Sequence, residues 1–244
     1  MGLGDEIMAT ARARRLHESN GYPVCVVGRN GAPRWSPVWE NNPRIVKTRE
    51  RRCNVLASGG GAGRPYIAAK TSRAWRWKHW EREPGEIYLS DQELQFAEPY
   101  AGFILVEPHT KFAWSNKAWP IERWAALVRG DESRYIQVGP LGTTALPGVR
   151  LVETTFREAC AVLARSLAFM GTEGALHHAA AALGVPAVVL WSEFISPEFT
   201  GYDSQTNIRH AGPACGARIS CRGCAASMLA IEVAEVAAAI KAKL

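Results

Sequence analysis

Residues 167–191 read LAFMGTEGALHHAAAALGVPAVVLW. The apolar runs 167–171 and 186–191 are short and bounded by Gly or Pro, which predicts two buried strands. Residues 173–183 between them predict a helix that ends at Gly184. Because a strand, a crossover helix and a second strand form a right-handed parallel unit, this stretch assigns the chain to the α/β class.

The rest of the chain repeats this alternation. In the second half we expect strands over 102–108 and 134–140, and helices over 120–129, from Thr154 or Thr155 to Arg165, and over 228–243. In the first half we expect a helix over 5–19 and strands over 22–28, 53–58 and 86–90, with no clear period over 66–83. A boundary near residues 98–102 then divides the chain into two α/β domains, 1–98 and 99–244, of which the first is small.

The composition fits a globular protein with an anionic partner. The chain has 244 residues, of which 47% are hydrophobic and 21% charged, and a net charge of +6. No apolar run reaches the ~20 residues that a membrane span needs, and the N-terminus lacks the apolar core of a secretory signal, so we expect a cytoplasmic location. The charge favours a nucleotide diphosphate, an acidic glycolipid, nucleic acid or an anionic membrane surface as partner.

The first motif, GLGD at residues 2–5, stands at the head of the first predicted helix. Glycine lets the backbone approach a ligand closely, and a helix N-terminus offers free N–H groups and a positive dipole. Asp5 can act there as a general base on an acceptor hydroxyl. The alternative is that Asp5 only caps the helix. A strand normally precedes such a loop, so we also expect that this strand is missing or that Met1 is an internal methionine.

The second motif comprises 109–111 (HTK) and 114–120 (WSNKAWP), between a predicted strand and a predicted helix. Ligands of open α/β sheets bind at that edge. Thr110, Ser115 and Lys117 can hold a diphosphate through hydrogen bonds and one point charge. The alternative is a solvated surface loop, which the two flanking tryptophans disfavour.

The third motif covers residues 171–186, where a strand ends and the next helix begins. The N–H groups of that helix point back at the sheet edge, an arrangement that binds phosphate. His177 and His178 lie one turn into the helix, so one can face the site while the other faces away. The alternative is that either histidine is a core residue whose hydrogen bonds are made within the protein.

K-x-W-P at 117–120 is followed by G-x-E-x4-H-x-A-A-A-L-G-x-P at 171–186, and together they resemble glycosyltransferase family 9, whose best-known members are the ADP-heptose:lipopolysaccharide heptosyltransferases. The opening GLGD and the NPRI at 42–45 also look like motifs of that family. The resemblance covers most of residues 99–240 and is thinner over 1–98, so the chain looks like a compact, divergent member.

The resemblance implies a GT-B-like fold, in which two Rossmann-like domains with parallel sheets face a cleft, here with a reduced N-terminal domain. The N-terminal domain would hold the acceptor and the C-terminal domain the nucleotide sugar. Such enzymes typically work without a metal or another cofactor. The implied reaction moves a heptose or hexose from a nucleotide diphospho-sugar to a hydroxyl of a glycan or glycolipid, as in lipopolysaccharide biosynthesis, with the inner membrane surface as an alternative location.

Carried over residue by residue, Asp5 matches the family's catalytic base, Lys117 its diphosphate-binding Lys and His178 its donor-site His, while Glu173 stands where Asp is usual. Gly174 and Ala175 replace the usual Ser or Thr and the usual Gly, which argues against a standard heptosyltransferase. The expected donor-binding residues are Thr110, Lys111, Ser115, Lys117, Gly139, Gly171, Thr172, Glu173, Gly174 and His178. The expected acceptor-binding residues are Gly4, Trp75, Arg76 and Trp77.

Two alternatives to this function stay open. Residues 73–82 (RAWRWKHWER) interleave cations with aromatics, which suits stacking on a sugar but equally suits single-stranded nucleic acid or packing on the domain. The acceptor could therefore be DNA carrying a modified base. The short first domain and the altered donor motif also fit a nucleotide-sugar-binding protein that has lost catalysis.

Cys215, Cys221 and Cys224, with His210 nearby, form half of a zinc signature. In a cytoplasmic chain we expect reduced structural thiols, or a disulfide in the purified protein, and no metal. Zinc or an iron–sulfur centre is the alternative.

Overall fold

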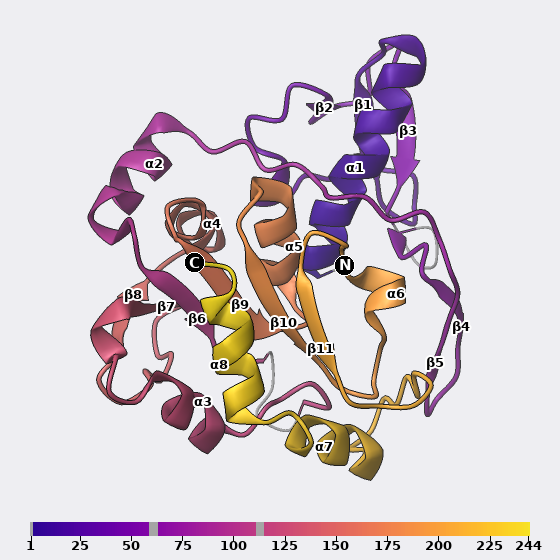
Figure 1. Ribbon diagram of the computed structural model, residues 1–244. Coiled ribbons are helices and arrows are strands. Elements are labelled where there is room, and N and C mark those ends of the chain that lie inside the picture. The colour runs from indigo at the N-terminus through magenta and orange to yellow at the C-terminus, as the bar shows by residue number, and fades with distance from the viewer. Residues whose placement is uncertain (1, 59–62, 111–114) are drawn as a thin grey trace.

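The larger of two parallel sheets forms the centre of the computed structural model, which describes residues 2–58, 63–110 and 115–244 (Figure 1). Its strand order is β11-β10-β9-β6-β7-β8, and every pairing is parallel. The strands are β6 (Ile104–Glu107), β7 (Tyr135–Gly139), β8 (Arg150–Glu153), β9 (Ala168–Thr172), β10 (Ala187–Trp191) and β11 (Thr206–Arg209). The helices of this half are α3 (Ile121–Val128), α4 (Phe156–Ala164), α5 (Ala175–Leu183), α6 (Pro197–Thr200), α7 (Arg222–Leu229) and α8 (Val233–Lys241).

Both faces of this sheet are covered, which explains why its strands read as unbroken apolar runs. Successive strand residues point to opposite faces. In β9, Phe169 therefore packs into one apolar cluster together with residues of α4 and α5. Met170 packs into the other cluster, with residues of α3, α7 and α8.

The smaller sheet has the order β2-β1-β3 and is also parallel. It consists of β1 (Val24–Val27), β2 (Ile45–Val46) and β3 (Asn54–Ala57), and α1 (Leu3–Asn20) packs on it. All four residues of β1 are buried, as its apolar run predicts. The two parallel sheets and their helices confirm the predicted GT-B-like α/β architecture with a reduced first unit. Within the described ranges no strand precedes α1, and the missing-strand hypothesis stays a prediction.

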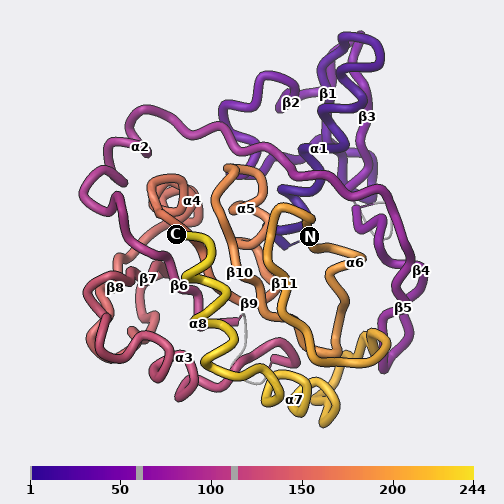
Figure 2. Tube along the Cα trace, viewed as in Figure 1, coloured from indigo at the N-terminus to yellow at the C-terminus, as the bar shows by residue number. Residues whose placement is uncertain are grey.

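An antiparallel hairpin, β4 (Ile67–Lys70) and β5 (Trp75–Trp77), belongs to the first half of the chain but lies against the second half. The indole of Trp77 donates a hydrogen bond to the carbonyl of Phe194 (3.0 Å), and the indole of Trp80 donates to that of Phe199 (2.7 Å). Figure 2 shows the hairpin running down one edge of the molecule, away from β1 and β3. The 66–83 segment, which shows no period in the sequence, is therefore ordered by long-range contacts.

The predicted strand over 86–90 is wrong. This segment is extended but pairs with no strand in the described structure, because side chains bind its backbone instead. The Thr10 hydroxyl accepts the N–H of Glu86 (2.6 Å), and the carbonyl of Tyr88 accepts from the Arg157 guanidinium (2.7 Å). Helix α2 (Asp91–Ala97), which was not predicted, follows it with a capping box between Ser90 and Glu93 and packs on α4.

The single helix predicted over 228–243 is also wrong, because α7 and α8 are separate helices with an angle of 60° between them. Side chains at the start of α3 hold the break, since the carbonyl of Ile231 accepts hydrogen bonds from the Trp119 indole (3.2 Å) and from Arg123. In the part of the chain that is described, no single helix is long and apolar enough to cross a membrane, although this bent pair passes that test of length and composition when taken together.

Replacing Arg157 by Met should lower the free energy of unfolding by about 3 kcal/mol, because it leaves the partly buried Glu93 without its cation. The Arg157 side chain is 11% exposed and that of Glu93 18%, and Arg157 also donates to the carbonyl of Pro37. The matched control is Arg165→Met. Its ion pair with Glu98 is 41% and 67% exposed, so less than about 1 kcal/mol should be lost. Urea denaturation of both variants measures this, and equal losses would contradict the structural role of Arg157.

Candidate functional site

A cavity of about 840 Å³ lies where the first turn of α1 meets the first turn of α5. Gly4 makes this approach possible, because a Cβ at that position would lie 2.6 Å from Cδ2 of His178. The residues that line the cavity come from both halves of the chain, and they are Gly2, Leu3, Gly4, Asp5, Glu6, Met8, Arg64, Tyr66, Glu107, Lys117, Glu173, Gly174, Ala175 and His178. The predicted cleft between the two units is therefore present.

Asp5 is buried, and its carboxylate is held from two directions. Its Oδ1 accepts a hydrogen bond from the Tyr66 hydroxyl (2.6 Å), and its Oδ2 accepts one from Nε of Arg64 (2.8 Å). The N–H of Gly2 also donates to Oδ2 (2.9 Å), so Asp5 also caps the N-terminus of its own helix. The capping role and the catalytic role are thus compatible.

Tyr66 and Arg64 were not predicted from the sequence, because they lie about sixty residues from Asp5 in a segment without periodicity. Burial, followed by the charge of Asp5, raises the pKa of Tyr66 well above its usual value. Its hydroxyl therefore stays protonated and donates to Asp5 throughout the physiological range. Together the two residues fix the orientation of the carboxylate.

Lys117 enters the cavity from the loop before α3 and forms an ion pair with Glu173. Burial acts to raise the pKa of Glu173, but the Lys117 ammonium and His177 together lower it below its usual value. The backbone N–H of Lys117 is bound by the Ser115 hydroxyl (3.3 Å), and its ammonium lies 5.2 Å from the centre of the Phe194 ring. A fixed cation thus stands beside the start of α5.

Of the two histidines on α5, His178 lines the cavity, while Nδ1 of His177 accepts the N–H of Gly174 (3.0 Å) and its Nε2 donates to the carbonyl of Thr200 (3.1 Å). Nδ1 of His178 lies 2.8 Å from the Tyr202 hydroxyl. Burial, with the charges of His177 and Lys117, lowers the pKa of His178 well below its usual value, so its imidazole is neutral at pH 7. This confirms the expectation that one histidine faces the site and the other faces away.

A second cavity of about 540 Å³ lies at the carboxyl ends of β6 and β7. Pro108, Val138, Phe156 and Leu176 supply much of its apolar lining, and Thr110 and Gly139 also contribute to it. Such an apolar pocket with a few polar groups suits a planar heterocycle. Glu107 lines both this cavity and the first, and burial raises the pKa of its carboxyl to about 8.

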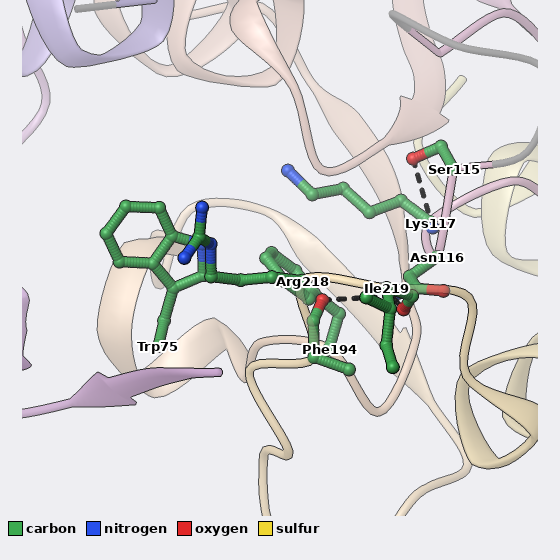
Figure 3. Close-up of a pocket in the computed structure, with 8 residues that line it drawn as sticks. Trp75, Ser115, Asn116, Lys117, Phe194, Arg218 and Ile219 are labelled. Carbon is green, nitrogen blue, oxygen red and sulfur yellow. Dashed lines mark hydrogen bonds between the residues drawn. The ribbon is translucent and has the colours of Figure 1, made fainter. Parts of the chain in front are cut away.

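A third, smaller pocket of about 240 Å³ opens on the other side of Lys117 (Figure 3). Lys117 reaches toward it from one side, and the Arg218 guanidinium lies over the Trp75 ring at 5.4 Å on the other. Asn116 forms its wall by donating to the carbonyls of Ala217 (3.0 Å) and Ile219 (2.8 Å). Lys117 therefore connects this pocket with the first cavity.

The predicted site residues fall into several groups. Gly4, Asp5, Lys117, Glu173, Gly174 and His178 share the first cavity, Thr110 and Gly139 line the second, and Ser115 and Trp75 line the third. Gly171 and Thr172 are buried in β9 and line none of these three, and a Cβ at Gly171 would lie 2.6 Å from Cζ of Phe169. Trp77 packs between Tyr66 and Phe194, Arg76 is exposed, and Lys111 lies outside the described residues.

The fold and the inter-unit cavity define a GT-B-like α/β protein. The model of one family, glycosyltransferase family 9 (heptosyltransferase), matches residues 81–222, which is more than half of the chain. The chain therefore belongs to glycosyltransferase family 9. No curated protein sequence was found to match it.

Solved structures support the same fold at low sequence identity. A glycosyltransferase family 9 protein from Veillonella parvula DSM 2008 has a TM-score of 0.69 and 14% identity, with 100% of this chain and 94% of that chain covered. TibC from enterotoxigenic E. coli H10407, described as an iron-containing dodecameric glycosyltransferase, has a TM-score of 0.65 and 14% identity, covering 100% and 73%. E. coli ADP-heptose lps heptosyltransferase II has a TM-score of 0.51 and 18% identity, covering 65% and 53%.

Replacing Glu107 by Gln should stabilise the protein more at pH 8 than at pH 5. The pKa of Glu107 in the folded state is raised to about 8. The contribution of Glu107 to the free energy of unfolding is therefore fully present below the pKa that its carboxyl has in the unfolded chain, and it is lost as the pH rises toward 8. Glutamine does not titrate. The difference in free energy of unfolding between the variant and the parent should therefore increase by about 1 kcal/mol or more from pH 5 to pH 8. Denaturation at both pH values tests this, with the exposed Glu153→Gln as control, and a gap independent of pH would contradict it.

Proposed function

We propose that the protein transfers a sugar, a heptose or hexose, from a nucleotide diphospho-sugar to a hydroxyl of a glycan or glycolipid. One observation carries this proposal: the carboxylate of Asp5 from the first unit and the Lys117–Glu173 pair from the second line the same cavity. A base and a cationic diphosphate site thus face each other across one space. With a glycolipid acceptor, the reaction would take place in the cytoplasm at the inner membrane surface.

The donor would bind with its base in the apolar second cavity and its diphosphate at the start of α5. The two cavities are adjacent, since Leu3, Glu107 and Ala175 line both. A diphosphate would take over the Lys117 ammonium from Glu173, and the first turn of α5 adds its positive dipole end. Glu173 would then be available to accept hydrogen bonds from sugar hydroxyls.

In the transfer step, the bond between the anomeric carbon and the diphosphate oxygen breaks and a bond to the acceptor oxygen forms. The acceptor proton passes to the Asp5 carboxylate, whose position Tyr66 and Arg64 fix. The negative charge that develops on the leaving diphosphate is met by Lys117 and by the helix dipole. This arrangement supports transfer without a metal in the cavity, because Lys117 and the helix dipole supply the positive charge that a divalent ion would otherwise provide.

Replacing Asp5 by Asn should lower the turnover number about 100- to 10,000-fold, because the amide cannot accept the acceptor proton. Donor binding should be retained, since Asp5 lies on the acceptor side. The matched control is the exposed Asp91→Asn, which should retain full activity. Transfer assays with radiolabelled nucleotide sugars and isothermal titration with the donor measure both quantities. Full activity of the Asp5 variant would refute its role as base.

Replacing Lys117 by Met should weaken binding of a nucleoside diphosphate about 10- to 100-fold, as expected for loss of a charge-assisted contact. Lys117→Arg retains the cation and should lose much less. Lys47→Met, which removes an exposed cation elsewhere, controls for net charge. Thermal shifts with a panel of nucleotides without added metal measure the affinities. Equal affinities of the Met variant and the parent would place the diphosphate elsewhere, and binding without transfer would favour a protein that has lost catalysis.

A further inference from the structure

Three cysteine thiols converge at the start of α7, outside the cavity assigned to sugar transfer. Sγ of Cys215 lies 3.4 Å from Sγ of Cys224 and 4.0 Å from Sγ of Cys221, and all three sulfur atoms lie within 4.8 Å of one another. A tetrahedral ion with metal–sulfur bonds of about 2.3 Å separates its sulfur ligands by about 3.8 Å. The three thiols are therefore spaced as such a ligand set requires.

The backbone holds these thiols in place. Cys221 is the N-cap of α7, and Cys224 lies in the first turn of that helix. The Asn116 side chain accepts the N–H of Cys221 (3.0 Å), and the carbonyl of Glu193 accepts that of Cys215 (2.8 Å). These backbone hydrogen bonds fix the positions from which the sulfur atoms, as thiolates, could bind a metal.

The sulfur atom of Cys215 contacts the sulfur atoms of both other cysteines, and Cys224 is buried. A disulfide would use only two of the three sulfur atoms and leave the third beside it. One divalent ion would bind all three as thiolates.

We propose that Cys215, Cys221 and Cys224 bind one thiolate-seeking divalent metal ion, zinc or iron, in a tetrahedral site whose fourth position is open to a further ligand. This replaces the expectation of unliganded thiols, which the spacing of the cysteines along the chain could not test. The proposal concerns a site separate from the transfer reaction and does not depend on the proposed function.

The ion would have a structural role. The loop closed by Cys215 and Cys221 carries Ala217, Arg218 and Ile219 to the pocket beside Lys117 (Figure 3). Asn116 joins this loop to the donor motif, since it binds two of the loop carbonyls as well as Cys221. The metal would thus hold one wall of that pocket, and its removal should loosen the wall without altering Asp5.

Elemental analysis of the whole chain tests the site directly. The protein is expressed without a metal-binding tag in medium that contains both zinc and iron, and is purified under reducing conditions without chelators. We expect close to one equivalent of zinc or iron per chain. Cys215→Ser, Cys221→Ser and Cys224→Ser should each lose most of it, whereas Cys53→Ser, the matched control at a half-buried cysteine outside the cluster, should retain it.

A second measurement keeps the proposal testable if a serine variant fails to fold. Removing the metal from the parent protein with a chelator should lower its melting temperature, and one equivalent of zinc should restore it. Cobalt in its place should give the intense sulfur-to-cobalt absorption and the visible bands of a tetrahedral thiolate site. Parent protein without bound metal, a disulfide between Cys215 and Cys224, or metal retained by a folded triple serine variant would each overturn the proposal.

Discussion

The close contact between α1 and α5 is the constraint on which the site depends. Gly4 on α1 lies against His178 on α5, and a Cβ at position 4 would clash with the His178 ring in its present position. Because Asp5 follows Gly4 directly, the same contact determines how far the carboxylate stands from Lys117 and Glu173. The glycine of this motif is thus explained by helix packing as much as by access for a ligand.

The charges of the site are paired before any substrate arrives. Asp5 is held by Arg64, and Lys117 by Glu173, so neither charge is left uncompensated in a partly buried space. Fixed groups of this kind need little reorganisation during reaction, which is the basis of electrostatic preorganisation. The neutral His178 and the protonated Tyr66 complete the lining without adding charge.

The parts of the structure that depend on local patterns were predictable, and those that depend on distant partners were not. Strands β6, β7, β9 and β10 and helices α3, α4 and α5 follow from local patterns, whereas β8 was not predicted. The first cavity gathers residues of all three predicted motifs. The strand predicted over 86–90 fails because side chains from α1 and α4 bind its backbone. Tyr66, Arg64 and Glu107 escaped prediction because nothing near them in the sequence indicates what they contact.

The β4–β5 hairpin leaves the first unit and is bound to the second through Trp77, Trp80 and the backbone pairing of Ala74 with Ala217. The two units are therefore joined at the helix contact, at the contacts of α4 with α2 and the segment before it, and along this edge. A wide hinge motion that separates them would have to detach the hairpin and expose its tryptophans to water. The enzyme would therefore admit and release its substrates by local movement of loops, with the spacing of the two units kept constant throughout the cycle.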